Sequence, residues 1–416
     1  MPGRGGIAAR LRRGPHRAGA GTRPGAARRL AIAVGIGAVF LANVDASAFT
    51  LAVPLLHRAF PAAPAGQLSL VQSGYGIGFA ALILLAGQFT DRRGPRWPLV
   101  AGLTLFTAAS LAGAAAPGPL WVYAARTASG AGIATAVPAA LSLLLADADG
   151  TARRRRTGQW GAAGAMAAGC GPVLGGVLGQ LVGWRGLFLL TAAPAAVMLA
   201  VAVLGPAARE PAARPARARG TVLRRPGVPL AVLASAIVGA GVYALQVMTG
   251  FALVGGAGLS AVEAGLVLSP ASLLAAFTAL RVGHLRDSRG TGIACAAGGA
   301  LLLAGTATAV LAGRAAPLAG AAAGATLGVV GLGVAATCVS TAAVLAAGPA
   351  VGRVTSISQV ARQAGGAAGA ATAGAAIGSV LSPGALDSGW AMLAVTGCLI
   401  VILGGALARS PARMPS

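Results

Sequence analysis

The chain has 416 residues, of which 56% are hydrophobic and only 10% are charged. Its 65 glycines raise the apolar share far above the half or so found in soluble domains, which excludes both a water-soluble globule and a disordered chain. The 32 basic residues, all of them arginine, outnumber the eight acidic residues and give a net charge of +24.

The residue types that are missing exclude several kinds of chemistry. A Walker phosphate loop and Schiff-base catalysis both need a lysine, and the chain has none, so ATP-driven pumping is not expected. The four cysteines stand singly, without the CxxC spacing of zinc or redox sites. We find no nucleophile, metal cluster or carboxylate pair with suitable spacing, and the sequence predicts no enzyme activity, no metal and no cofactor.

Residues 1–29 are rich in Gly, Pro and Arg and contain no acidic residue. Such a segment is also found in nucleic-acid-binding arms and transit peptides. We interpret it as a disordered cytoplasmic tail beside anionic lipid, with no nucleic-acid partner.

Twelve long apolar runs follow this tail, and each is long enough to cross a hydrocarbon core of about 30 Å as a helix. The sequence therefore predicts an all-α integral membrane protein with twelve transmembrane helices. The runs cover approximately 30–56, 68–90, 97–117, 119–146, 158–183, 186–206, 228–254, 262–282, 291–313, 316–347, 355–381 and 388–408.

The arginines predict the orientation of these spans in the membrane. If the N-terminus is cytoplasmic, 27 arginines fall on the cytoplasmic side and three on the outer side, while Arg126 and Arg362 lie within spans. The positive-inside rule then predicts that both termini of a multi-pass plasma-membrane protein are cytoplasmic.

A Pro- and Arg-rich linker at 207–227 divides the chain into two sets of six spans, 30–206 and 228–408, followed by a short tail at 409–416. The segment from Gly87 to Gly94 after the second span recurs from Gly283 to Gly290 after the eighth span. Paired six-helix halves in parallel repeat are known among transporters, whose substrate site lies between the halves near the middle of the membrane.

These motifs resemble the major facilitator superfamily and, within it, the drug:proton antiporter branch. The resemblance covers residues 30–408. The loop signature is Gly87-x-x-x-Asp91-Arg92-x-Gly94-x-Arg96, with a weaker copy containing Gly283, Asp287 and Gly290. Two further matches lie in the fourth and fifth spans, Arg126-x-x-Ser129-Gly130-x-Gly132 and Gly171-Pro172-x-x-Gly175-Gly176. The other matches are the first-span segment from Val44 to Pro54, the segment from Gly258 to Gly265, and Arg362-Gln363-x-Gly365-Gly366. Leu70 and Thr191 stand where this branch has tryptophan and asparagine.

Asp45 is the one acidic residue that lies deep within a predicted span. A carboxylate at that depth is costly unless it is protonated, paired or hydrated, so an intramembrane acid is a functional hypothesis by default. Asp45 lies about 22 Å and Arg126 about 21 Å from the cytoplasmic edge at 1.5 Å per helical residue, so the two side chains can meet. We predict a proton-coupling pair; the alternative is a structural ion pair that never titrates.

Four glycines recur every fourth residue in the fifth span, from Gly171 to Gly183, and Pro172 removes a backbone donor there. The spacing predicts close helix packing and a bend, and the resemblance implies that Gly171, Pro172, Gly175 and Gly176 seal the transport path against leak. Tyr75, Tyr243, Gln246, Met248, Phe251 and Arg362 are candidates for lining a substrate cavity. Core or lipid-facing packing remains an alternative for the first five, and bonding to helix carbonyls or lipid phosphate an alternative for Arg362.

The resemblance implies a secondary transporter that exports small, drug-like organic molecules in exchange for protons by alternating access. Contacts of Asp91 with arginines at the cytoplasmic loops would latch one state. Its expected partners are a small-molecule substrate, protons and the lipid bilayer, and a monomer is expected. Two alternatives remain open: a dedicated exporter or symporter of one metabolite, and a membrane sensor that does not transport.

Overall fold

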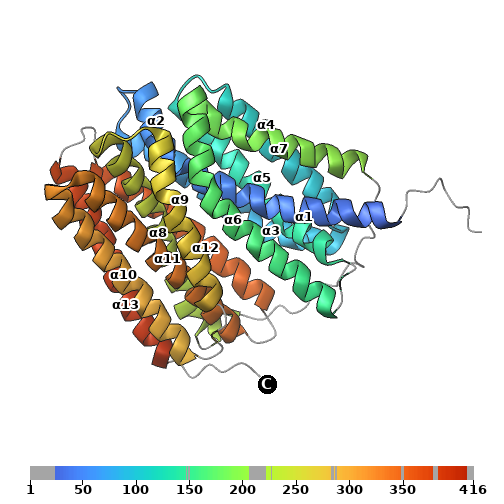
Figure 1. Cartoon of the computed structure of the whole chain (residues 1–416). Coiled ribbons are helices and arrows are strands. Elements are labelled where there is room, and N and C mark those ends of the chain that lie inside the picture. Colours follow the sequence, from blue (N-terminus) through green and yellow to red (C-terminus); the bar gives the residue numbers. More distant parts are fainter. Residues whose placement is uncertain are drawn as a thin grey trace, which may run out of the picture.

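The computed structural model describes residues 24–146, 148, 150–205, 222–225, 227–282, 285, 288–347, 351–377 and 383–409. Every regular element in this part of the chain is helical. The helices form two bundles that lie side by side, α1 to α7 in one and α8 to α13 in the other (Figure 1). The loop motif residues Gly283 and Asp287, most of the 207–227 linker and the tail beyond 409 lie outside the described residues.

The elements of the first bundle correspond to the first six predicted spans. They are α1 (Pro24–Ala48), the 3-10 turn η1 (Phe49–Leu51), α2 (Ala52–Ala59), α3 (Ala65–Arg93), α4 (Arg96–Ala114), α5 (Pro119–Leu145), α6 (Gly150–Val182) and α7 (Trp184–Leu204).

A second 3-10 turn, η2 (Val222–Arg224), precedes the other bundle. Its elements are α8 (Val228–Gly250), the π-helical turn η3 (Phe251–Gly256), α9 (Ala261–Val282), α10 (Ser288–Ala315), α11 (Pro317–Ala347), α12 (Val351–Ile377) and α13 (Pro383–Arg409). The architecture of twelve spans is therefore as predicted, with two of them interrupted near one end.

Both interruptions have a local cause. Pro54 has no N–H to donate to the carbonyl of Thr50, and the chain tightens into η1 immediately before it. At η3 the N–H of Ala257 donates to the carbonyl of Ala252, and the turn ends near Gly258, whose φ of 71° favours glycine. The first helix begins at Pro24, inside the predicted tail of 1–29, because proline fits the first turn of a helix.

Helix packing repeats between the two bundles. In the first bundle α1 packs on α6, α3 on α5, and α4 on both α5 and α7; in the second α8 packs on α12, α9 on α11, and α10 on both α11 and α13. The bundles contact each other mainly through α3 with α12 and α6 with α9, two pairs that exchange under this repeat. The fold is thus a pair of parallel repeats facing each other across a pseudo-two-fold axis.

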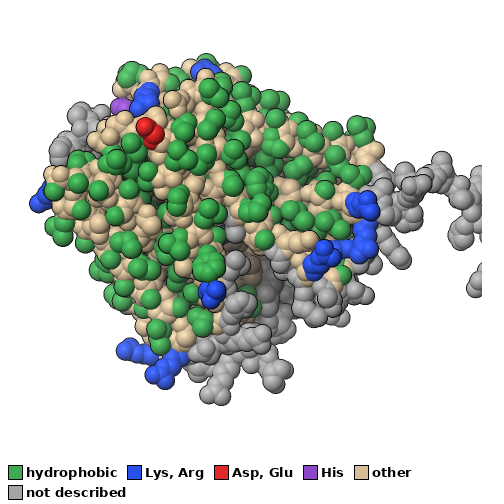
Figure 2. Space-filling view, in the orientation of Figure 1, with side chains coloured by type: hydrophobic (Ala, Val, Ile, Leu, Met, Phe, Trp, Pro, Cys, Tyr) green, Lys and Arg blue, Asp and Glu red, His purple; other side chains and the backbone are tan. Residues whose placement is uncertain are grey.

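The exposed surface of the bundles suits a bilayer. Hydrophobic side chains dominate the visible face, and arginines gather at its margins (Figure 2). Ten helices of the described chain are long and apolar enough to cross a membrane. The two other spans, α3 and α12, are more polar and form one of the contacts between the bundles.

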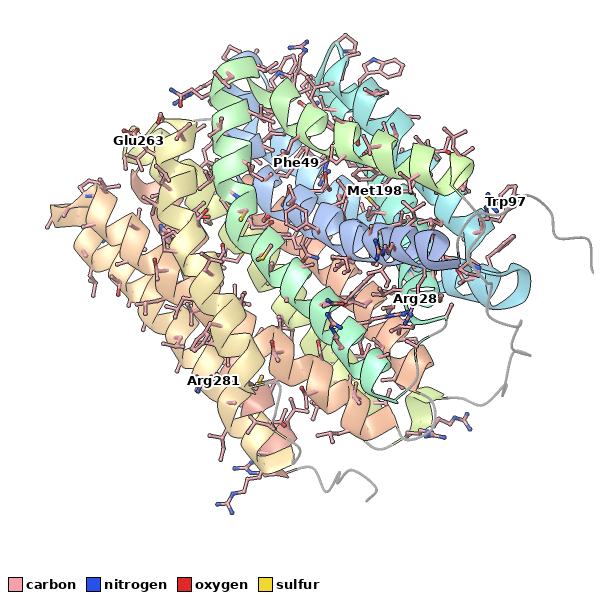
Figure 3. All side chains as sticks on the ribbon, turned by 45° about the vertical axis from the view of Figure 1, so that its right-hand side comes forward. Arg28, Phe49, Trp97, Met198, Glu263 and Arg281 are labelled. Carbon is pink, nitrogen blue, oxygen red and sulfur yellow. The ribbon has the colours of Figure 1, made fainter. Side chains whose placement is uncertain are left out.

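Side chains at the helix ends have the character expected at a membrane surface. Trp97, 68% exposed at the start of α4 and next to Arg96 in the chain, lies at the edge of the molecule, whereas Phe49 lies inside the bundle (Figure 3). Arg281 and Glu263 lie at opposite ends of α9. Exposed tryptophan near an arginine is typical of the membrane–water interface.

Candidate functional site

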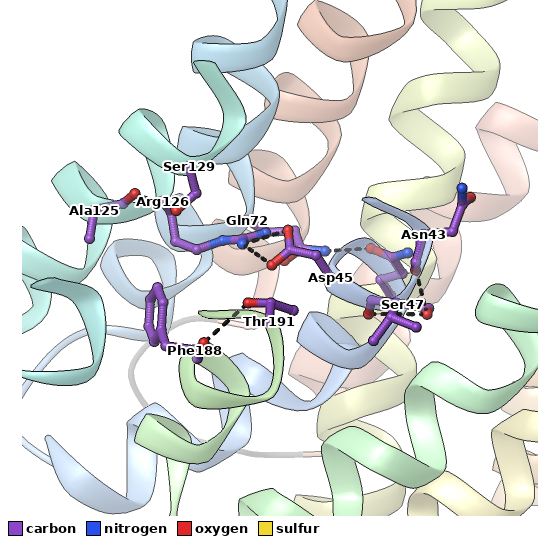
Figure 4. A network of polar contacts seen from close by, with 11 residues as sticks. Asn43, Asp45, Ser47, Gln72, Ala125, Arg126, Ser129, Phe188 and Thr191 are labelled. Carbon is purple, nitrogen blue, oxygen red and sulfur yellow. Dashed lines mark hydrogen bonds and ion pairs between the residues drawn. The ribbon is translucent and has the colours of Figure 1, made fainter. Parts of the chain in front are cut away.

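An ion pair joins α1 and α5 in the interior of the first bundle. Nη1 of Arg126 donates to both carboxylate oxygens of Asp45, at 2.9 and 2.8 Å, and each side chain is only 1% exposed (Figure 4). The structure thus brings together the two residues whose predicted depths agree. A buried pair with these contacts is stable only while both charges remain, because removing either leaves an uncompensated charge.

Two aromatic rings enclose the guanidinium of Arg126. Its central carbon lies 3.7 Å from the ring centre of Phe49 and 4.4 Å from that of Tyr75, within cation–π range. The Nε–H of Arg126 is buried and finds no acceptor in the described chain, and Thr191 lies next to Asp45. The guanidinium is therefore in contact with η1 and α3, the two elements that carry these rings.

Polar contacts cross between the bundles near this pair. The amide of Gln72 on α3 donates to the side-chain oxygen of Gln246 on α8, and the hydroxyl of Ser73 donates to the carbonyl of Ala367 on α12 at 2.7 Å. The side-chain oxygen of Gln72, Oε1, is buried and has no hydrogen-bond partner among the described residues. These bonds tie the first bundle to the second at the level of the ion pair.

A cavity of about 650 Å³ lies between the bundles beside these contacts. Most of its wall is apolar, and the lining residues carry no charge. Its polar side chains are Asn43, Ser47, Thr50, Gln246, Thr249 and Ser272, contributed by α1, η1, α8 and α9. The volume and character suit a small amphipathic molecule.

The predicted cavity residues occupy three kinds of position. Gln246 lines the main cavity. Tyr75, Met248 and Phe251 are buried in packing, and the hydroxyl of Tyr243 donates to Oε1 of Gln363 at 3.0 Å. These four aromatic or sulfur-containing side chains do not line the main cavity.

Arg362, the sixth of these residues, lines a separate pocket of about 70 Å³ within the second bundle. Its own backbone carbonyl faces Gly239 of α8 closely, which fixes α12 against α8.

The glycine motif of α6 lies where three helices meet. Gly171 and Gly175 face Ser47 and Ala48 of α1, while Gly176 faces the carbonyl of Ala261 at the start of α9. Pro172 lines the cavity. The motif therefore forms part of the contact between the two bundles, on one side of the cavity, where a larger side chain has no room.

The loop motif after α3 is described only in part. The side chains of Asp91 and Arg92 and the surroundings of Gly87 are not described. In the second copy, Gly283 and Asp287 lie outside the described residues. Gly94 has a φ of 81° and ends α3, a conformation that favours glycine. Arg96 donates to the carbonyl of Val203 on α7 at 3.4 Å, and Gly290 lies in the first turn of α10.

Apart from Gln246, the polar residues of the cavity wall were not predicted from the sequence, and neither was the amide bond between Gln72 and Gln246. Gln72 is an amide inside a predicted span, and this signal was available because polar residues within a membrane face the bundle interior. Asn43, Ser47 and Thr50 surround Asp45 in the sequence but gave no separate signal. Among the described residues, no three His, Cys, Asp or Glu side chains gather where they could hold a metal ion.

Comparison with known proteins identifies the family. Residues 35–370 match the model of the Major Facilitator Superfamily. The chain belongs to this superfamily. It is accordingly a multi-pass membrane protein of a family of transporters rather than of enzymes.

Curated relatives include proteins named for antibiotic resistance and export. The chain is 36% identical over 173 residues to the methylenomycin A resistance protein of Streptomyces coelicolor, covering 41% of this chain and 35% of that protein. It is 36% identical over 198 residues to the cephamycin export protein CmcT of Amycolatopsis lactamdurans, covering 47% and 39%. The chain thus matches little more than a third of the length of these relatives.

Solved structures share the fold over almost the whole chain. A bacterial homolog of the human lysosomal transporter Spinster, in an inward-facing and occupied conformation, has a TM-score of 0.73 at 16% identity and covers 93% of this chain and 97% of its own. A variant of the nucleoside transporter NupG has a TM-score of 0.72 at 13% identity, covering 91% and 99%. At such identities the likeness establishes the fold alone.

Proposed function

We propose that this protein exports small amphipathic organic molecules from the cell in exchange for protons, by alternating access. The observation that carries the proposal is the buried pair of Asp45 and Arg126, because Asp45 lies within five residues of the cavity-lining Asn43, Ser47 and Thr50. The relatives named for resistance and export support the direction of transport.

The geometry suggests how a proton and a cargo molecule compete. A deprotonated Asp45 holds Arg126 between Phe49 and Tyr75, and Phe49 belongs to η1, next to the cavity-lining Thr50. Protonation of Asp45 removes the charge that holds Arg126, so the rings and η1 lose their fixed position. Proton entry from the outer side therefore weakens the cargo site, and proton loss to the cytoplasm restores it.

The packed end of the interface fits the outer side of the membrane. One apolar cluster includes Phe49, Leu51 and Leu55 of the first bundle together with Phe251 and Leu253 of the second. With both termini in the cytoplasm of a plasma-membrane protein, these five residues would form the outer seal, and the cavity would face inward. Asp91, through arginines of neighbouring loops and the positive end of a helix, would then stabilise one of the two states.

Proteoliposomes with an imposed pH gradient test the proposal. With a labelled panel of cationic, neutral and anionic amphipathic compounds, Asp45→Asn is expected to abolish gradient-driven accumulation while leaving counterflow exchange partly intact. Glu263→Gln is the matched control, because Glu263 is exposed at the start of α9 and glutamine preserves its capping contact with Ser260. If Asp45→Asn still accumulates cargo with normal proton dependence, another residue couples transport to protons.

A further inference from the structure

The second bundle contains a small polar pocket that is distinct from the main cavity. It has a volume of about 70 Å³, roughly that of two water molecules, and lies between α8, α11 and α12. Its polar lining among the described residues consists of Ser235, Ser340, Thr355, Ser358, Gln359 and Arg362, which are hydroxyl and amide groups and one cation without a carboxylate.

Arg362 has no ionic partner among the described residues. The acidic side chains that the structure describes are Asp45, which pairs with Arg126, and Glu263, which is exposed and bonded to Ser260. Arg362 is 11 residues past the start of α12, about 16 Å along the helix and hence near the middle of the membrane. A cation at this depth requires a counter-charge or water.

A hydroxyl group in the same pocket also lacks a partner. Oγ of Ser358, on a side chain only 7% exposed, makes no hydrogen bond in the described chain. Ser358 precedes Arg362 by four residues, so both side chains lie on one face of α12. An O–H donor without a partner and a guanidinium without a counter-ion, both among the described residues, are groups that bind a carboxylate through charge-assisted hydrogen bonds.

The position of the pocket connects it to the cargo path. It shares Ala336 of α11 with the wall of the main cavity. Ser340, Val344 and Thr355 at its rim are exposed and lie toward the ends of α11 and α12 that the predicted topology places at the cytoplasm. An anion can therefore enter from the cytoplasmic side while an attached apolar group extends into the main cavity.

We propose that this pocket binds the anionic head group of the cargo, so that the transporter prefers amphipathic organic acids with a single carboxylate. Arg362 is the ion-pairing group, Ser358 adds a hydrogen bond, and the apolar part of the molecule occupies the cavity of about 650 Å³. The proposal rests on the proposed export function for its cargo, but it concerns binding at equilibrium and does not depend on proton coupling.

A pair of nearly isosteric probes tests it. Binding of 1-naphthylacetate and of its neutral amide is measured by calorimetry on the purified full-length chain in phosphatidylcholine nanodiscs, without a pH gradient. The wild type is expected to bind the acid about tenfold more tightly than the amide, which corresponds to about 1.4 kcal/mol. Arg362→Gln should bring this ratio close to one while leaving amide affinity unchanged, and Arg362→Lys should retain part of it.

Controls separate the pocket from other sources of anion preference. Arg281→Gln removes an exposed arginine at the end of α9 and should keep the wild-type ratio; Ser358→Ala should lower the ratio by a smaller factor than Arg362→Gln. Thermal unfolding and gel filtration verify that each variant is folded. Nanodiscs that contain phosphatidylglycerol test the other source of the same chemistry, a lipid phosphate.

Three results would overturn the proposal. They are equal binding of acid and amide by the wild type, an unchanged ratio in Arg362→Gln, and loss of the wild-type preference when phosphatidylglycerol is present, which would assign the pocket to lipid. Failure of the export proposal is a separate result. In that case Asp45→Asn would transport cargo with normal proton dependence, whatever the ratio of acid to amide affinity in the wild type and in Arg362→Gln.

Discussion

An alanine at position 176 would place a methyl group against the backbone of the opposite bundle. Gly176 of α6 faces the carbonyl of Ala261, and a Cβ atom there would also lie 3.0 Å from Cα of Val262. Both neighbours are backbone atoms at the first turn of α9, so they cannot move aside as a flexible side chain would. The added methyl group therefore disfavours any state in which α6 and α9 are closed against each other at this point.

The size of this effect follows from the cost of overpacking, which is typically 1–3 kcal/mol. A penalty of about 2 kcal/mol on the sealed state alone multiplies the ratio of open to sealed molecules by roughly 30. The higher helix propensity of alanine acts equally in both states and leaves this ratio unchanged. Gly161→Ala is the matched control, because Gly161 is in the same helix and a Cβ atom there meets nothing within 4 Å.

Distances between spin labels measure this shift. In a background without the four native cysteines, labels at Leu120→Cys on α5 and Leu318→Cys on α11 report the separation of the outer ends, and both positions are exposed. Gly176→Ala should populate a longer distance than Gly161→Ala. Identical distance distributions in the two variants would refute the view that the contact of Gly176 with Ala261 seals the interface.

Three further outcomes follow from the same structure. Arg126→Gln is expected to lower the free energy of unfolding by about 3–5 kcal/mol, because it leaves Asp45 buried and unpaired. Adding Asp45→Asn should recover part of this loss. If thermal unfolding of the double variant showed the sum of the two single losses, the pairing would be contradicted. Gln72→Ala, which breaks the bond to Gln246, should shift the sealed-to-open ratio in the spin-label assay by about 2- to 10-fold, and no shift would remove this bond from the switching contacts. A cysteine probe placed in the linker at 207–227 should react with an impermeant maleimide only after permeabilisation, and labelling of intact cells would reverse the predicted topology.

The long runs of mostly apolar residues predicted the twelve spans, including the more polar α3 and α12, because a segment that crosses lipid must be a long helix. The meeting of Asp45 and Arg126 could also be predicted, since helical rise converts sequence position directly into depth. Depth does not specify the direction in which a side chain points around the helix. Tyr75 and Phe251 were for this reason named as cavity residues, although they pack within the protein.

The missed features depend on rotation and on local backbone changes. Asn43, Ser47 and Thr50 line the cavity because α1 presents that face to the second bundle, and neighbouring Gly and Ala residues give little periodic pattern from which to predict it. The interruption at Phe49–Leu51 could have been predicted from Pro54, which cannot donate to the carbonyl four residues earlier. The π-helical turn η3 has no comparable sequence signal.

The uncharged wall of the main cavity has a consequence for the range of molecules that it accommodates. Its alanine, glycine, leucine and valine residues make apolar contacts, which are not directional. They therefore accommodate hydrocarbon groups of different shapes almost equally well. Each buried methylene contributes about 0.8 kcal/mol, roughly a fourfold gain in affinity, whatever its position in the molecule. Such a cavity binds molecules in order of their size and hydrophobicity. Discrimination between functional groups must come from the few polar side chains at its border.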